Sequence, residues 1–222
     1  MSDGRKELAP EAVHLWLAPL DRPCDVALLT AEEQSRAERF KIEQVRQQFV
    51  ASRVQLRIVL ANYLGLKPVE VPILYEASGK PVLHESCGRG LHFNVSHSDR
   101  LAIYAVTRAG QVGVDVELQR DLPNAEMLVE RFFSLRDRQI FQSLPEGERR
   151  AAFFRAWTRK EAVLKAVGKG VQSLDYCEVT FAPGEPDAVL RMGDDAECRA
   201  KWLLHGWQPK GDYVAAVAVE LK

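Results

Sequence analysis

The chain has 222 residues, of which 46% are hydrophobic and 27% charged, as expected of a folded globular protein with one large domain or two small ones. Its net charge of −1 at pH 7 gives no overall basic field, so we expect no nucleic-acid partner. The net charge does not exclude a local basic patch. No run approaches the roughly 18 apolar residues of a membrane span, and the start MSDGRKELAP lacks the apolar core of a signal peptide. The four cysteines are scattered, with no C-x-x-C pair, which disfavours a zinc site or a disulfide framework and suits a reducing compartment. We therefore expect a cytoplasmic protein with no membrane segment.

In the first half of the chain, one long helix pattern lies between strand patterns. The helix is predicted over residues 30–65, because Thr30 and Glu33 form a capping-box signature at its start and Gly65 suits its C-terminal end. A break within this long segment stays open. The predicted strands of this half cover residues 13–17, 91–98 and 101–106.

The second half repeats this arrangement loosely. GVDVEL, residues 113–118, is predicted as a strand, followed by a short helix over about 123–134 and a longer one over about 145–168. The closing strands are predicted at 177–181, 188–192, 201–207 and 213–219. The segments LAIYAV and YVAAVAV are similar, which hints at an internal duplication with a join near Gln111; two unrelated halves are the alternative. Either way, the pattern predicts an α+β fold.

The predicted strand GVDVE carries two acidic side chains on one face. Asp115 and Glu117 stand two residues apart, so they point to the same side and repel each other. A hard divalent cation such as Mg²⁺ would explain the pair, because it takes oxygen ligands and keeps positions open for phosphate oxygens and water. An ordinary solvent-facing strand side is the alternative, and for two carboxylates alone it is the commoner case.

The predicted helix WTRKEAVLK places three side chains on one face. Trp157, Glu161 and Lys165 are spaced at i, i+4 and i+8. Glu161 is a candidate for a third oxygen ligand or for a base beside the cation, and Lys165 could stabilise charge on a phosphate. A solvated Glu–Lys pair is the alternative. Trp157 suits packing better than chemistry.

A basic stripe in the predicted helix of the first half suits phosphate binding. Arg46, Arg53 and Arg57 share one helical face, Arg39 joins them if the helix is unbroken, and Arg36 lies nearby. Arginine grips phosphate with two parallel hydrogen bonds. A solvated helix face is the alternative.

Two short segments of the first half could also contact phosphate. In FNVSHS, His97 follows an apolar strand and could donate to a phosphate, although a histidine at a strand end is more often only structural. In SGKP, Ser78 to Pro81, a tight turn presents Lys80, but the full spacing of a P-loop is lacking and a plain surface turn is the alternative.

Taken in chain order, the segments GKP, FNVSHS, GVDVE and WTRKEAVLKAVGKG resemble those of the 4′-phosphopantetheinyl transferase superfamily, with the same spacing between blocks. GVDVE with W-x-x-K-E-x-x-x-K is highly specific to that superfamily. FNVSHS and SGKP select its larger, surfactin-synthetase-activating type, in which one chain carries two similar halves. The resemblance runs from about Arg36 to Gly170.

This resemblance implies a pseudo-duplicated 4′-phosphopantetheinyl transferase fold with two similar α+β halves and the active site between them. Residues 1–110 would contribute to binding the coenzyme A nucleotide, and residues 111–222 would carry the metal-binding and catalytic motifs. The implied reaction transfers the 4′-phosphopantetheine moiety of coenzyme A to a serine of an apo acyl or peptidyl carrier protein, with adenosine 3′,5′-bisphosphate as leaving group. It implies Mg²⁺ as cofactor, with Mn²⁺ also suited to an all-oxygen site, and a monomer. Carriers of polyketide, nonribosomal peptide and fatty-acid biosynthesis all remain open.

By the same resemblance, residues of these motifs receive roles. The implied catalytic residues are Asp115, Glu161, Lys165 and His97. The implied metal ligands are Asp115, Glu117 and Glu161. The implied coenzyme A contacts are Arg36, Arg39, Arg53, Lys80, Pro81, Ser96, His97, Asp115 and Lys165.

Within the coenzyme A set, Arg53 with Arg36 or Arg39 would hold the 3′-phosphate. His97 and Lys165 would contact the pyrophosphate. Ser96 and Lys80 would help to fix the nucleotide.

Three further expectations follow from the resemblance. Glu161 would take the proton of the carrier serine, directly or through a water, although a carboxylate that also holds a metal is a weak base. Asp137 falls where relatives have a supporting acidic residue. The carrier, an acidic helical protein in this family, is expected to dock near residues 122–134. The apolar residues expected to meet its helix are Leu122, Met127 and Leu128.

Two other functions fit parts of the pattern. A metal-dependent nuclease also combines strand carboxylates with a nearby Glu and Lys, but the near-zero net charge and the lack of a strong basic tract disfavour it. A non-catalytic protein that binds coenzyme A or a carrier would need only the basic stripe and His97. The intact acidic residues and Lys165 argue against that alternative.

Overall fold

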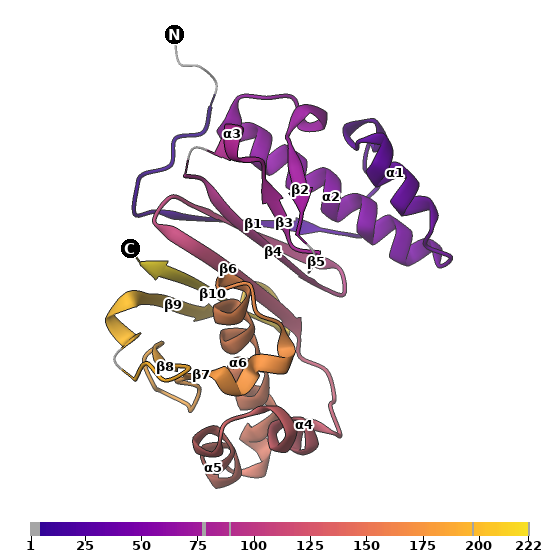
Figure 1. Ribbon diagram of the computed structural model, residues 1–222. Helices are drawn as coiled ribbons and strands as arrows, with labels where there is room; N and C mark the ends of the chain where they lie inside the picture. The colour runs from indigo at the N-terminus through magenta and orange to yellow at the C-terminus, as the bar shows by residue number, and fades with distance from the viewer. Residues whose placement is uncertain (1–4, 77–78, 89, 197, 222) are drawn as a thin grey trace. The chain divides into compact units, whose positions relative to one another are not determined.

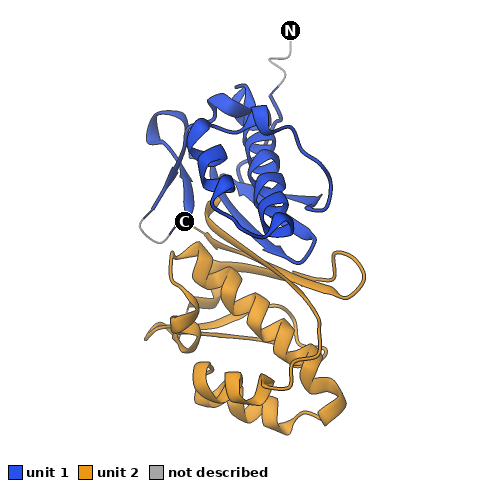
Figure 2. Ribbon diagram, turned by 90° about the vertical axis from the view of Figure 1, so that its right-hand side faces the viewer, with its two compact units in different colours: residues 1–108 blue, residues 109–222 orange. Residues whose placement is uncertain are grey.

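The structure is a computed structural model that describes residues 5–76, 79–88, 90–196 and 198–221. The chain divides into two compact units, residues 1–108 and 109–222 (Figure 2). Each unit combines a three-stranded antiparallel sheet with one long helix, so the predicted α+β class is confirmed (Figure 1). In the described part of the chain, no helix is both long and apolar enough to cross a membrane.

The first unit is built on a sheet with the strand order β1–β5–β4. Its strands are β1 (Val13–Pro19), β4 (His92–Ser98) and β5 (Leu101–Thr107). Helix α2 (Glu43–Leu64) packs on one face of this sheet, through a core that includes Leu56, Leu60 and Tyr104. The remaining elements are η1 (Val26–Leu28), α1 (Ala31–Glu38), η2 (Pro68–Glu70), β2 (Ile73–Tyr75), β3 (Pro81–Leu83) and α3 (Glu85–Gly88).

The segment predicted as one helix over residues 30–65 forms two helices. The predicted capping box starts α1, because Glu33 N donates to Thr30 Oγ1 over 3.3 Å and Thr30 N donates to Glu33 Oε2 over 3.1 Å. The predicted C-terminal glycine ends α2, since Gly65 has a φ of 68° and its amide donates to Ala61. Both ends are therefore confirmed, and the helix breaks between them.

The second unit is built on a sheet with the strand order β6–β10–β9. Its strands are β6 (Gly110–Leu118), β9 (Trp202–Trp207) and β10 (Tyr213–Leu221). Helix α6 (Glu146–Ala166) packs on one face of this sheet, in a core that includes Phe153, Val163 and Ala216. The remaining elements are α4 (Ala125–Phe132), α5 (Leu135–Ser143), η3 (Val171–Tyr176), β7 (Cys177–Val179), β8 (Val189–Met192) and η4 (Cys198–Lys201).

The two similar segments LAIYAV and YVAAVAV occupy equivalent places. They lie in β5 and β10, each the central strand of its sheet between two antiparallel partners. Helix α5 is absent from the predicted elements. Ser134 is its N-cap, whose hydroxyl accepts a hydrogen bond from the amide of Asp137 over 3.3 Å, so the segment RFFS ends one helix and caps the next.

Candidate active site

The motifs GVDVE and WTRKEAVLK meet because β6 and α6 touch through their backbones. A Cβ atom added to Gly113 would lie 1.9 Å from the carbonyl oxygen of Ala162 and 2.5 Å from the amide nitrogen of Ala166. Only glycine fits such a close approach. Because side chains two apart share a strand face, Asp115 and Glu117 point to the side that α6 covers. Gly113 therefore sets the distance between strand carboxylates and helix.

Around this contact the structure gathers the four predicted polar side chains of the second unit. Lys165 Nζ donates to Asp115 Oδ1 over 2.6 Å, and Asp115 is only 4% exposed. Glu161 is 7% exposed, and among the described residues its Oε1 atom is buried without a hydrogen-bond partner. The pKa of Glu161 is raised to about 7: burial raises it most, Asp115 and Glu117 also raise it, and Lys165 lowers it. Asp115, Glu117 and Glu161 thus lie close enough to affect the titration of Glu161, and Lys165 is paired with Asp115.

The donor chemistry of this group suits a hard cation. Asp115, Glu117 and Glu161 offer only carboxylate oxygens, the ligands that Mg²⁺ prefers, and the open Glu161 oxygen would gain a partner. However, no set of three or more His, Cys, Asp or Glu side chains in the described ranges is arranged to hold a metal ion. The positive charge that the structure places against Asp115 is the Lys165 ammonium. The metal ligands therefore stay a prediction.

Lys160, next to Glu161, is fixed in the interior of the second unit. Its ammonium lies 2.6 Å from Asp137 Oδ2 and donates to the carbonyl of Leu174 over 2.8 Å and to that of Cys177. Neither Lys160 nor Asp137 is exposed to solvent. The pair ties α5 to α6 directly before Glu161.

The sequence contains a signal for this interior lysine. Lys160 falls at helical spacing from Ala156, Val163 and Leu164, all of them fully buried, and so lies on the apolar stripe of α6. Trp157 is also confirmed as a packing residue, because its ring stacks on Phe153 with centroids 5.5 Å apart.

In the first unit, two predicted arginines converge on two aromatic rings. The Arg36 guanidinium lies 5.5 Å from the ring centroid of Phe49 and 5.6 Å from that of Tyr75. The Arg53 guanidinium lies 5.5 Å and 5.3 Å from the same two rings. Among the described residues, Arg53 Nε and Nη1 are buried without a hydrogen-bond partner. Two guanidinium groups beside the same rings, of which Arg53 has open donors, can hold a doubly charged phosphate.

The predicted basic stripe is not continuous, because the helix breaks at residues 39–42. Phe40 turns back onto α2, with its ring centroid 5.1 Å from that of Phe49, and Arg39 is left as the exposed C-terminal cap of α1. Arg46 is exposed and pairs with Glu43 one turn earlier.

Arg57 of the same stripe is a structural residue. It is 2% exposed, pairs with Glu33 over 2.6 Å and donates to the carbonyls of Pro68, Val69 and Val71. Its Nε and Nη1 atoms are thus bound to protein groups, and its charge is paired with Glu33.

The segment around Lys80 lies beside the arginine pair. Pro81 is the register partner of Tyr75 in the β2–β3 hairpin, which places the preceding Lys80 at the end of this hairpin. Burial lowers the pKa of Lys80, and Glu76 opposes that shift. Ser78 lies outside the described residues.

The two predicted coenzyme A contacts in FNVSHS, Ser96 and His97, point to opposite sides of β4. His97 pairs with Ala102 and shares the sheet face of Tyr104, whose hydroxyl donates to the Ser52 carbonyl of α2 over 2.9 Å. His97 is exposed on this face, the one that packs against the helix of Arg53. Ser96 is buried on the opposite face. Within this unit, only His97 of the two is on the side of the arginines.

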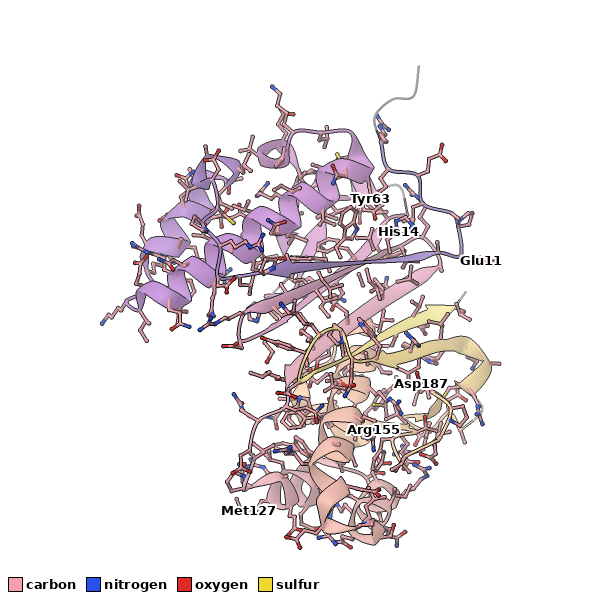
Figure 3. All side chains as sticks on the ribbon, turned by 180° about the vertical axis from the view of Figure 1, so that it is seen from behind. Glu11, His14, Tyr63, Met127, Arg155 and Asp187 are labelled. Carbon is pink, nitrogen blue, oxygen red and sulfur yellow. The ribbon has the colours of Figure 1, made fainter. Side chains whose placement is uncertain are left out.

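The segment expected to meet a carrier exposes one of its three predicted apolar residues. Met127 of α4 is 69% exposed (Figure 3), whereas Leu122 and Leu128 are partly buried against the core of the second unit. Leu135, at the start of α5, is 71% exposed and is absent from the prediction. Leu122, which precedes α4, and Leu128 within it thus keep only part of their surface for a partner, and the docking site stays a prediction.

Known proteins resemble the chain along most of its length. A family model for the 4′-phosphopantetheinyl transferase superfamily matches residues 111–218, and one for the 4′-phosphopantetheinyl transferase N-terminal region matches residues 21–109. The 4′-phosphopantetheinyl transferase HetI of Nostoc sp. is 39% identical over 219 residues, covering 91% of this chain and 92% of its own. The 4′-phosphopantetheinyl transferase psf-1 of Bacillus pumilus is 33% identical and covers 75% of this chain and 70% of its own.

Among solved structures, the Thermotoga maritima holo-acyl-carrier-protein synthase matches 51% of this chain and 64% of its own, with a TM-score of 0.40 and 22% identity. This structural similarity is too low to assign a family, so the assignment rests on the sequence matches.

Proposed function

Because the chain belongs to the 4′-phosphopantetheinyl transferase superfamily, we propose that it transfers the 4′-phosphopantetheine moiety of coenzyme A to a serine of an apo acyl or peptidyl carrier protein. The products are the holo carrier protein and adenosine 3′,5′-bisphosphate. One observation supports this most directly: Asp115 and Lys165, from motifs 50 residues apart, form a hydrogen bond beside the buried Glu161.

The reaction brings a serine hydroxyl to a phosphorus atom that already carries negative charge. Lys165 is proposed to stabilise charge on the phosphate oxygens; its partly exposed ammonium, paired with Asp115, supports this role. Asp115, Glu117 and Glu161 are the side chains proposed to hold Mg²⁺, with Mn²⁺ as an alternative. When bound, the ion would offset the charge of the pyrophosphate.

Glu161 Oε1 is the atom proposed to receive the serine proton, directly or through a water. A buried carboxylate whose pKa lies near 7 is suited to exchanging a proton near neutral pH. Metal coordination would weaken this basicity, so the two roles of Glu161 compete. Loss of the side chain should harm both.

Coenzyme A is proposed to be held by residues of both units, with the nucleotide contacts in residues 1–110 and the catalytic and metal-binding groups in residues 111–222. Arg53 and Arg36 suit the 3′-phosphate, because Arg53 has open donors beside the same aromatic rings. The remaining contacts proposed are those of Arg39, Lys80, Pro81, Ser96, His97, Asp115 and Lys165.

The carrier protein is proposed to dock on α4, where Met127 offers exposed apolar surface. The protein is proposed to act as a monomer in the cytoplasm, in line with four free cysteines. The carrier belongs to polyketide, nonribosomal peptide or fatty-acid biosynthesis, and the test with carriers of each pathway identifies which.

The decisive experiment is intact-mass spectrometry of apo carrier proteins incubated with this protein, coenzyme A and Mg²⁺. We expect a mass gain of one phosphopantetheine that disappears with EDTA and falls sharply in Glu161→Gln. Carriers of all three pathways are tested in parallel. No gain on any carrier, together with no thermal protection by coenzyme A, would overturn the proposal; protection by DNA instead would favour the nuclease alternative.

A further inference from the structure

A small cavity of the second unit is lined by arginines that the proposed reaction does not use. Its volume is about 220 Å³, and it lies where α6 faces the ends of β6, β9 and β10. Its polar lining includes Gln119, Arg155, Arg159, Trp207 and Gln208. All of these residues belong to the same compact unit.

The two arginines are fixed one helical turn apart on α6. Arg155 Nε donates to the carbonyl of Phe181 over 2.9 Å, and Arg159 Nη1 donates to that of Thr180. Two guanidinium groups at this spacing repel each other, and Arg155 lowers the pKa of Arg159, after the larger effect of burial. Asp187, shown with Arg155 in Figure 3, forms an ion pair with Arg159 and so neutralises that charge.

The charge of Arg155 is not matched in this way. Its Nη2 atom is buried and has no hydrogen-bond partner among the residues that the structure describes. Burial lowers the pKa of Arg155, opposed by the Glu148 carboxylate on the same helix. A buried donor without an acceptor destabilises the folded protein, more strongly if it is charged. The cavity therefore has more donors and positive charge than its own groups satisfy.

We propose that this cavity binds a small anion, a phosphate or carboxylate group, with Arg155 as its main partner and the side-chain amides of Gln119 and Gln208 at its walls. The cavity is smaller than the roughly 300–1,000 Å³ of pockets for drug-sized ligands, so it suits a single charged group and not a nucleotide. The anion can be free in solution or be an acidic side chain of a partner protein. The site does not depend on the proposed transferase reaction.

The test uses the indole NH resonance of Trp207 as a local reporter in a ¹⁵N-labelled protein, assigned with Trp207→Phe. Inorganic phosphate, acetate and apo carrier protein are titrated separately at constant ionic strength. We expect a saturable shift in the wild type and its loss in Arg155→Gln. A shift with the free ions identifies a free anion, and a shift with the carrier alone identifies a carboxylate of that partner.

Arg150→Gln is the matched control, because Arg150 is an exposed arginine of the same helix and the charge change is identical. It should keep the full shift. Arg155→Lys keeps the charge without the planar fork and should weaken the shift while preserving the fold. No saturable shift in the wild type, or an equal shift in Arg155→Gln, would overturn the proposal and reduce the effect to nonspecific ion binding.

Discussion

Replacing Glu161 by Gln tests whether its buried carboxylate destabilises the metal-free protein and binds a cation. In the metal-free protein, burial and the neighbouring Asp115 and Glu117 raise the pKa of Glu161 from 4.5 to about 7. The folded protein therefore holds this proton more tightly than the unfolded chain. Its free energy of unfolding falls as the pH rises from about 4.5 to about 7, and the full loss persists above pH 7.

The size of this loss follows from the two pKa values. At about 1.36 kcal/mol per pH unit, a rise from 4.5 to about 7 corresponds to about 3 kcal/mol as an upper limit. Water entry and small rearrangements around the charge reduce it, so we expect about 1–3 kcal/mol. The Gln side chain of Glu161→Gln is uncharged at every pH, so this variant should not show the pH-dependent loss in the free energy of unfolding. In EDTA the variant should match the wild type near pH 4 and be more stable by that amount at pH 8.

The assay is urea unfolding of both proteins at the two pH values, first with EDTA and then with Mg²⁺. At pH 8, Mg²⁺ at 100 times its Kd should stabilise the wild type by about 2.7 kcal/mol, and the variant much less. The advantage that the variant has in EDTA should thus shrink strongly in Mg²⁺. Glu220→Gln, at an exposed position of β10, should change the stability by less than about 0.5 kcal/mol throughout. A variant no more stable than the wild type at pH 8 in EDTA would refute the reasoning about burial, and equal Mg²⁺ stabilisation of both would refute Glu161 as a ligand.

Three further substitutions test other contacts. Gly113→Ala should lower the free energy of unfolding by about 1–3 kcal/mol and weaken the site, because the added Cβ would lie 1.9 Å from the Ala162 carbonyl oxygen. The control is Gly147→Ala in α6, the helix of Ala162, where the space around the glycine is open; it should be neutral or stabilising in the same denaturation assay. Arg53→Gln should raise the KM for coenzyme A by about 10- to 100-fold and leave that for dephospho-coenzyme A nearly unchanged; a matched rise for both substrates would contradict contact with the 3′-phosphate. Met127→Glu should raise the carrier KM by about tenfold without changing the affinity for coenzyme A, and equal damage to both would rule out α4 as the docking surface.

The second-unit side chains could be grouped by face from the sequence because their spacing follows the backbone period. Asp115 and Glu117 are two apart on a strand, and Glu161 and Lys165 are four apart on a helix, so each pair shares a face whatever the tertiary structure. The contact between the two faces depends on how β6 and α6 pack, which the residue spacing does not encode. Its one local signal is Gly113, since a glycine inside a strand often marks a close backbone approach.

The arginines of the first unit show where periodicity fails. Arg53 and Arg57 are one helical turn apart and look equivalent in the sequence. Arg57 is neutralised by Glu33, 24 residues away across the helix break, whereas Arg53 lies against Phe49 and Tyr75. The difference depends on which element packs over each residue, and helical spacing carries no information on that.

Two neighbouring residues of α6, Lys160 and Glu161, differ in whether their buried polar atoms have partners within the protein. Lys160 has no exposed surface, yet its charge is met by Asp137 and two carbonyl groups, the condition under which a buried ion pair is tolerated. Glu161, one residue further, keeps a buried oxygen without a partner among the described residues. Buried donors of Arg53 and Arg155 are left open in the same way. Because an unmet buried polar atom lowers the stability of the folded protein, its persistence calls for a compensating role, and a ligand that supplies the missing charge is the simplest one.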